Sequence, residues 1–162
     1  MTYATRVLRF LLGSRAVVLL VLGLVGCGGY EPPPAPQDPE PNPADPLEAR
    51  IRHRAPTEAP YMIRQGEARH FTVAPGQSAS FTLVLASGLC YKVIAQGADT
   101  VGELDLLLYT NDGVLVQQDT TTGTGAILGS TRPICLEDPA QLRVDLRASG
   151  TGEVATQLYA SP

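Results

Sequence analysis

The chain has 162 residues and a formal net charge of −4. All sixteen acidic residues follow Cys27, whereas three of the twelve basic residues precede it, so a chain beginning at Cys27 has nine basic groups and a net charge of −7. An acidic surface repels the phosphate backbone, which excludes nucleic acid as an expected partner. The length predicts one domain of ordinary size without room for a second.

The first 26 residues have the three parts of an export signal. Three arginines form a basic region, residues 16–25 form an uncharged apolar run, and Gly26 supplies a small residue before Cys27. Ten apolar residues rise about 15 Å as a helix, which is half of a bilayer core. We therefore expect residues 1–26 to be a signal peptide and not a membrane span.

The sequence Leu24-Val25-Gly26-Cys27 resembles the bacterial lipobox. In that motif the cysteine thiol takes a diacylglycerol before cleavage, so the resemblance implies that Cys27 is lipidated and anchors the chain in the cell envelope. In enterobacteria an aspartate after the cysteine favours inner-membrane retention, and here Gly28 follows, which favours the outer membrane. The alternative is an ordinary secreted protein with a chance cysteine.

Residues 27–57 are predicted to be the lipidated cysteine and a disordered, proline-rich linker. Eight of the fifteen residues from Pro32 to Pro46 are proline, which removes hydrogen-bond donors and fixes φ, so we expect polyproline II and no helix. We interpret this segment as a spacer, with a ligand for a proline-reading module as the alternative. The basic run Arg50–Arg54 is interpreted as a solvated linker end, with contact to anionic lipid or polysaccharide as the alternative.

Residues 58–162 are predicted to form an all-β domain. Apolar residues alternate with period two in residues 81–85, 104–108 and 142–146, which is typical of strands. Turn residues separate these runs, as at Pro75-Gly76 and Asn111-Asp112-Gly113. The pattern predicts an antiparallel β-sandwich or jelly roll of about eight strands and no helix. The predicted strands span residues 70–73, 78–86, 89–96, 104–109 and 114–118, and residues 120–125 are predicted to form a polar loop.

Two cysteines remain after Cys27. Because export leads to an oxidising compartment, we predict a disulfide between Cys90 and Cys135. It closes a loop of about 45 residues, worth roughly 4 kcal/mol in the chain-entropy model. A metal site built on both cysteines is the alternative, but neither histidine has suitable spacing.

Several short motifs together resemble the bacterial pre-peptidase C-terminal domain, over roughly residues 60–160. The residues that carry the resemblance are Gly66 with Phe71–Gln77 and Phe81–Leu83, then Leu104–Tyr109 with Asp112, Gly113 and Asp119, and finally Leu142–Arg147 with Gly150, Gly152 and Glu153. The resemblance implies a jelly-roll β-sandwich that is not itself an enzyme and that accompanies exported proteins, often peptidases. Related collagenase modules bind collagen and some bind calcium. No peptidase precedes the domain in this chain, which puts a role tied to a neighbouring protease in doubt.

Three aspartates are the candidate metal ligands, for calcium: Asp105, Asp112 and Asp119. Calcium needs several hard oxygens, and Asp112 and Asp119 flank one predicted strand. The alternative is turn chemistry, in which Asp112 shapes a hairpin and Asp119 accepts hydrogen bonds from loop amides. Apart from possible calcium, no cofactor is expected.

Four tyrosines are candidates for an aromatic binding face: Tyr61, Tyr91, Tyr109 and Tyr159. Tyrosine supplies contact area with a polar end, although packing in or beside the core is the alternative. A hydrolytic triad is not expected, because the two histidines, His53 and His70, have no nucleophile motif with them.

The resulting hypothesis is a lipid-anchored envelope protein that displays a non-catalytic β-sandwich as a binding or interaction module. The expected partners are the membrane, through the anchor, and an envelope protein or polysaccharide. The alternatives are a calcium-assisted carbohydrate- or protein-matrix-binding module, and a structural envelope lipoprotein.

Overall fold

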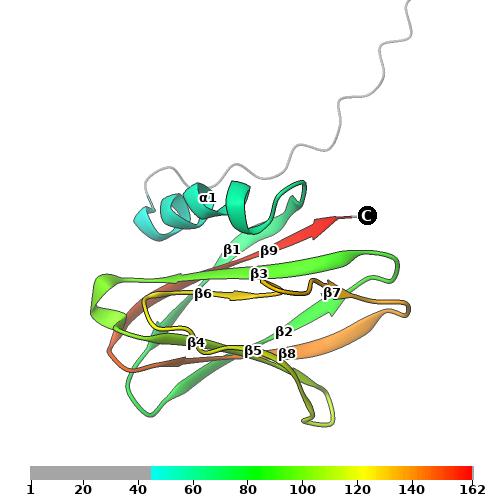
Figure 1. Ribbon diagram of the computed structural model, residues 1–162. Helices are drawn as coiled ribbons and strands as arrows, with labels where there is room; N and C mark the ends of the chain where they lie inside the picture. The colour runs from blue at the N-terminus through cyan, green and yellow to red at the C-terminus, as the bar shows by residue number, and fades with distance from the viewer. Residues whose placement is uncertain (1–44, 162) are drawn as a thin grey trace, which may run out of the picture. The chain divides into compact units, whose positions relative to one another are not determined.

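The computed structural model describes residues 45–161, which lie in the second of two compact units, Ala35–Pro162. The elements in this part of the chain are one α-helix, one short 3-10 helix and nine strands (Figure 1). In chain order they are α1 (Pro46–Glu58), β1 (Ile63–Val73), β2 (Ser78–Leu85), β3 (Cys90–Gly97), η1 (Asp99–Val101), β4 (Leu104–Thr110), β5 (Leu115–Asp119), β6 (Gly125–Leu128), β7 (Ile134–Cys135), β8 (Ala140–Ala148) and β9 (Gly152–Ser161).

The strands form two antiparallel sheets that pack face to face. Sheet A has the order β1-β9-β3-β6, with β7 paired to β3, and sheet B has the order β2-β8-β4-β5. Apart from the hairpin that joins β4 to β5 and the short step from β6 to β7, each connection crosses from one sheet to the other. Without the two-residue β7, this is the strand order of an eight-stranded jelly roll. The predicted all-β sandwich class is therefore confirmed.

The core lies between the sheets because alternate side chains of each strand point inward. Leu104, Leu106 and Leu108 of β4 are all fully buried, and Val144 and Leu146 of β8 lie opposite on the same inner face. The sequence period therefore predicted this face correctly. The turn signals also hold, since Gly76 and Gly113 adopt the positive φ that their turns require.

The disulfide prediction is confirmed. Cys90 and Cys135 are bonded, and they are paired residues where the short strand β7 meets β3. Two strands differ from the prediction: β6 was not predicted as a strand, and β1 is longer than predicted. β6 begins at Gly125, at the end of the segment predicted as a polar loop, and β1 begins seven residues before the predicted start at His70.

The predicted linker boundary at residue 57 is wrong, because residues 46–57 belong to α1. The Asp45 side chain accepts hydrogen bonds from the backbone amides of Leu47 (2.8 Å) and Glu48 (3.1 Å), and Pro46 occupies the first turn. Proline breaks a helix interior but favours its first position, so Pro46 starts this helix instead of preventing it. The rest of the predicted linker, the signal peptide and Cys27 lie outside the described residues.

Helix α1 lies across the outer face of sheet A (Figure 1). Leu47 and Ile51 are one turn apart on its buried side, and they pack with Ile94 of β3 and with Ala155 and Tyr159 of β9 in a second apolar cluster. Within residues 45–161 no helix is long and apolar enough to cross a membrane.

Candidate functional site

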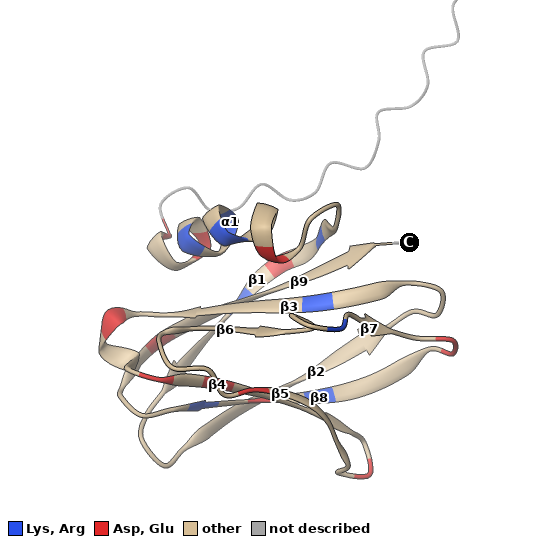
Figure 2. Ribbon diagram, viewed as in Figure 1, with Lys and Arg blue, Asp and Glu red and all other residues tan. Residues whose placement is uncertain are grey.

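Ion pairs and hydrogen bonds hold α1 to the rest of the domain, and several of the side chains that form them belong to the basic run predicted as a solvated linker end. Figure 2 shows the positions of the charged residues along α1 and the strands. Arg50 pairs with Asp99 at 2.6 Å, and this partner lowers the pKa of the Asp99 carboxyl. Arg54 donates to the carbonyl of Ala95 at 2.7 Å and also pairs with Glu58 at 3.0 Å. Two arginines of the run are therefore engaged with the domain.

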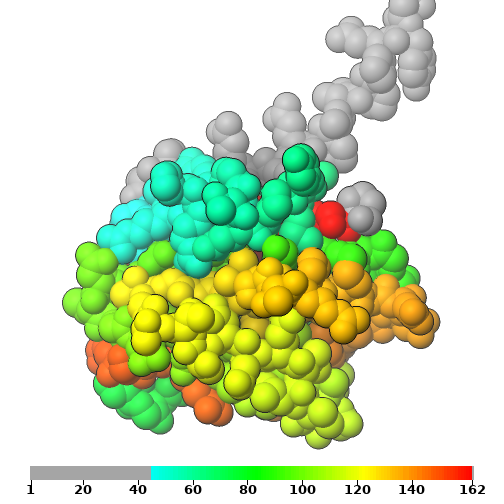
Figure 3. Space-filling model, in the orientation of Figure 1, coloured from blue at the N-terminus to red at the C-terminus, as the bar shows by residue number. Residues whose placement is uncertain are grey.

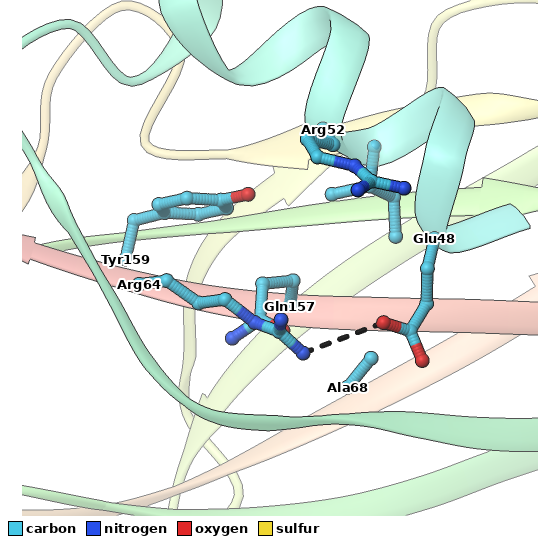
Figure 4. Close-up of a pocket in the computed structure, with 7 residues that line it drawn as sticks. Glu48, Arg52, Arg64, Ala68, Gln157 and Tyr159 are labelled. Carbon is cyan, nitrogen blue, oxygen red and sulfur yellow. Dashed lines mark hydrogen bonds and ion pairs between the residues drawn. The ribbon is translucent and has the colours of Figure 1, made fainter. Parts of the chain in front are cut away.

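A small pocket under α1 contains an ion pair with little solvent exposure (Figure 4). Glu48 of α1 and Arg64 of β1 approach to 3.4 Å, and their side chains are 10% and 12% exposed. Arg64 also donates to the side-chain oxygen of Gln157 at 2.6 Å. The Gln157 amide in turn donates to the carbonyls of Gln65 (3.0 Å) and Gly66 (3.3 Å), where β1 bulges away from its register with β9.

This network positions the helix and leaves no room for a ligand. The pocket has a volume of about 30 Å³, which is the space of about one water molecule. Moving α1 away from β1 would leave the buried charges of Glu48 and Arg64 without each other, which is unfavourable. The ion pair therefore keeps α1 and the β1 bulge in a fixed relative orientation. The residues of this pocket therefore stabilise the surface that lies beside it.

That surface is a wider groove of about 650 Å³ at the C-terminal end of α1. The volume falls in the range of small-ligand and peptide sites, about 300–1,000 Å³. The residues that line it are mostly apolar or aromatic and include two arginines: Arg52, Ala55, Pro56, Ala59, Pro60, Tyr61, Met62, Ile63, Arg64 and Tyr159. These described lining residues include no carboxylate, histidine, serine or cysteine, and the groove presents apolar and aromatic contact area beside the exposed side chain of Arg52.

Tyr61 is the most unusual residue of the groove. It is 99% exposed, and its backbone is left-handed, with φ at 63°. A non-glycine residue in this conformation costs roughly 1–2 kcal/mol, and such strain concentrates at binding and catalytic sites. The strain is imposed by its position, because Tyr61 joins the end of α1 to the start of β1.

Tyr159 forms the floor between the pocket and the groove, since it lines both. Figure 4 shows its ring beside Arg64, with Arg52 above it on α1. Burial raises the pKa of the Tyr159 phenol, and Arg64 and Arg52 oppose that shift. The phenol therefore remains a neutral hydrogen-bonding group beside two cations.

The predicted face of four tyrosines is wrong as a single surface. The structure brings Tyr61 and Tyr159 to one groove. Tyr91 is instead buried in the inner core, where its hydroxyl bonds both backbone groups of Ala86. Tyr109 lies on sheet B under the guanidinium of Arg143, 4.8 Å from the ring centroid. Strand alternation and the two-sheet fold separate the four side chains.

The predicted calcium ligands do not come together either. Asp105 and Asp119 lie near one end of β4, while Asp112 sits beyond its other end, and the described residues place no third carboxylate, histidine or cysteine in ligand range of Asp105 and Asp119. Asp119 accepts from the amides of Thr121 (3.0 Å) and Ile127 (2.6 Å), as loop chemistry predicts. A hydrogen bond from Thr110 lowers the pKa of Asp112, which shapes the hairpin.

One group of potential ligands exists that sequence reasoning missed, formed by Asp45, Glu48 and His70. Glu48 lies 3.3 Å from one ring nitrogen of His70 and Asp45 lies 3.7 Å from the other. Both carboxylates are already engaged, since Asp45 caps α1 and Glu48 pairs with Arg64. The group therefore fastens the start of α1 to β1. The sequence did not predict this group because Asp45 and Glu48 were assigned to the linker and not to the domain.

No protein-family model matches the chain, and no curated protein sequence matches it. Among solved structures it is similar to the pre-peptidase C-terminal domain of a collagenase from Bacillus anthracis, with 10% identity, a TM-score of 0.42, and coverage of 58% of this chain and 87% of that one. The family that the sequence resembles is thus also found among its structural neighbours.

Two further structures are similar over part of their length. One is from infectious bursal disease virus strain Gx, with 15% identity, a TM-score of 0.34, and coverage of 62% of this chain and 30% of that one. The other is a family two carbohydrate esterase from Cellvibrio japonicus, with 15% identity, a TM-score of 0.30, and coverage of 64% and 31%. This chain spans under a third of their length. At these TM-scores the assignment of fold rests on the strand order above, and function rests on the site.

Proposed function

We propose that this protein is a cell-envelope lipoprotein, anchored through Cys27, whose β-sandwich is a non-catalytic binding module with the groove beside α1 as its recognition surface. The observation that carries the proposal is Tyr61, a fully exposed aromatic side chain on a strained backbone at the edge of an apolar groove. Exposed aromatic residues that insert into a partner supply much of the binding energy at interfaces.

The arrangement of α1 suits display at the end of a tether. The eighteen residues from Cys27 to Ala44 span up to about 55 Å in the extended polyproline conformation that the sequence predicts. This tether joins the domain at the start of α1. A helix of thirteen residues is about 20 Å long, so the groove at its other end is separated from the point of attachment.

The chemistry of the groove favours a protein segment over a polysaccharide. Sugars are held by many directed hydrogen bonds, whereas this groove presents proline, methionine, isoleucine and tyrosine side chains. Arg52, which is exposed on α1 beside the groove, favours an apolar segment that also carries an acidic residue. The proposed partner is therefore an envelope protein.

The substitution Tyr61→Asn tests the recognition surface. Asparagine tolerates the left-handed backbone, so the variant is expected to be at least as stable as the wild type while losing the aromatic contact. The measurement is in-cell cross-linking of the tagged full-length chain, followed by mass spectrometry of the captured partner. Val84→Asn, at a 74% exposed site on β2, is the matched control.

We expect Tyr61→Asn to lower partner recovery about tenfold, as loss of one interface anchor does, while the control recovers the wild-type amount. Equal recovery of the partner by both variants would reject the groove as the recognition surface. The anchor is tested separately with Cys27→Ser and an alkyne-tagged fatty acid. Label that persists in this variant, or that is absent from the wild type, would reject lipidation at Cys27.

A further inference from the structure

The sandwich has two sides at which an edge strand of sheet A faces an edge strand of sheet B. On one side, side chains of β5 bond to the backbone of β6. Asp119 accepts from the amide of Ile127 and Gln117 accepts from that of Gly129, both at 2.6 Å. The yellow residues of these two strands lie side by side on the face that Figure 3 shows. This side of the sandwich is therefore closed.

The other side, between β1 and β2, is closed along only part of its length. Phe71 and Phe81 stack across it with ring centroids 5.2 Å apart. Arg69 lies over the Phe81 ring and donates to the carbonyl of Thr82 at 3.1 Å. On the N-terminal side of Arg69, a pocket of about 340 Å³ enters between the two sheets, and we call it the inner pocket. Its volume lies within the range of small-ligand sites, about 300–1,000 Å³.

The mouth of the inner pocket is formed by the bulge in β1. Gln65 pairs with Leu158 and Arg69 pairs with Thr156, so three residues of β1 stand opposite Gln157 alone. The Gln157 side chain stabilises the bulge by donating to the carbonyl of Gln65 at 3.0 Å. A bulge bends a strand away from its partner. It therefore uncovers the inner side of β9 where Thr156 and Leu158 lie.

The inner wall of the pocket is apolar apart from one hydroxyl group. Leu83 of β2, Val93 of β3 and Leu158 of β9 supply the apolar side chains. Thr156 lines the same wall and is only 3% exposed. None of the hydrogen bonds formed by residues 45–161 involves its hydroxyl. A buried polar group without a partner is unfavourable, so this hydroxyl marks a position where a bound ligand gains a hydrogen bond.

Arg69 supplies a positive charge at the mouth of the inner pocket. Its contacts are an aromatic ring and a carbonyl, and no carboxylate among the described residues pairs with it. Because Arg69 and Thr156 are directly paired, their side chains leave β1 and β9 on the same face, about 5 Å apart at Cβ. One anionic group can therefore accept hydrogen bonds from both.

We propose that the inner pocket binds a small carboxylic acid with an apolar body. The carboxylate accepts from the Thr156 hydroxyl and the Arg69 guanidinium, whose planar shape suits it. The body lies against the apolar wall. A phosphate is disfavoured because Glu67, the carboxylate among the lining residues, opposes a second negative charge. The pocket lies on the inner side of β9 and the groove on its outer side, so the inference depends on neither the proposed recognition surface nor the anchor.

The test is a titration of the full-length chain, held in lipid nanodiscs, with phenylbutyrate. Methyl NMR is the measurement, and we expect saturable shifts at Thr156, Val93 and Leu158. Phenylbutanol and phenylbutylamine have the same body with a neutral and a cationic head, and we expect each to bind at least about tenfold more weakly. Equal affinity for the three compounds, tighter binding of the amine, or the absence of saturable shifts at these methyl groups would overturn the proposal.

Substitutions at the mouth test the sign of the charge. Arg69→Gln is expected to weaken phenylbutyrate binding about tenfold through loss of a charge-assisted hydrogen bond. Arg132→Gln, in the exposed loop between β6 and β7, is the matched control and should leave the affinity unchanged. Glu67→Gln removes the opposing charge and is expected to strengthen binding. Weaker binding by Glu67→Gln, or unchanged binding by Arg69→Gln, would contradict a carboxylate ligand.

The substitution Thr156→Val separates binding from stability. It keeps the shape of the side chain and removes the unpaired hydroxyl, so the melting temperature without ligand is expected to rise. The affinity for phenylbutyrate is expected to fall about tenfold, because the carboxylate loses a donor. Thr72→Val, at an exposed site on β1, is the control and should weaken binding no further than the wild type. Undiminished affinity in Thr156→Val, or a lower melting temperature, would show that the hydroxyl has only a structural role.

Discussion

The two outer faces of the sandwich differ in what covers them. On sheet A, α1 covers the central strands, and Ile94 and Ala155 on that face are fully buried. On sheet B, no described element covers the face, and Val84 is 74% exposed. The same fold therefore has one face that is part of a second core and one that meets solvent.

The difference appears in the side chains that each face can accommodate. β3 has an almost continuous run of buried residues, whereas β2 alternates between exposed and buried residues. On the open face polar groups pair with one another, since Asp145 accepts from Ser80 (2.8 Å) and from Arg143 (3.0 Å). A sheet face needs apolar side chains only where another layer packs on it.

The largest expected effect on stability comes from the disulfide, which joins β3 and β7 in sheet A and has no counterpart among the strands of sheet B. Replacing both Cys90 and Cys135 with alanine should lower the free energy of unfolding by about 4 kcal/mol, because the 45-residue loop gains entropy in the unfolded chain. Urea denaturation of the full-length chain in detergent measures it. A loss below about 1 kcal/mol would mean that β7 is held to β3 mainly by packing.

The next effect tests whether α1 is an integral part of the domain. Ile51 is 2% exposed in the second apolar cluster, so Ile51→Ala should cost about 2–4 kcal/mol through the cavity that it leaves. Val84→Ala removes a smaller apolar side chain from the open face and should change stability by less than about 0.5 kcal/mol. Equal effects from the two substitutions, measured by thermal unfolding, would remove the distinction between the faces.

The smallest effect concerns an unfavourable charge on sheet B. One oxygen of Asp105 is buried without a hydrogen-bond partner among the described residues, and burial, followed by repulsion from Glu103, raises the pKa of this carboxyl. A raised pKa in the folded state means that the ionised form destabilises the fold. Asp105→Asn should therefore raise the melting temperature slightly at pH 7.

The stabilising effect of Asp105→Asn is expected to depend on pH. As the pH falls through the raised pKa of Asp105, the wild type takes up a proton in the folded state and loses the penalty. The advantage of Asp105→Asn should therefore shrink between neutral pH and pH of about 4, near the ordinary pKa of aspartate. An advantage that grows on acidification would show that Asp105 stabilises the fold as a carboxylate.

The sequence by itself determined the sandwich, most of its strands and the disulfide. Alternation of side chains is a property of each strand alone, as in Leu104–Leu108, and the turn at Asn111–Gly113 depends on neighbouring residues. The helix was missed although a local signal existed. Asp45 followed by Pro46, with Leu47 and Ile51 four residues apart, is a helix start that the high proline content concealed.

Only the tertiary structure decided which face α1 covers and which residues form the groove. Arg64 meets Glu48 sixteen residues away and Gln157 ninety-three residues away, and no local pattern encodes such pairs. The same holds for the candidate sites. The fold separates Asp112 from Asp105 along one strand, buries Tyr91, and brings Tyr61 beside Tyr159, because side chains from distant segments share a surface only after the sheets have paired.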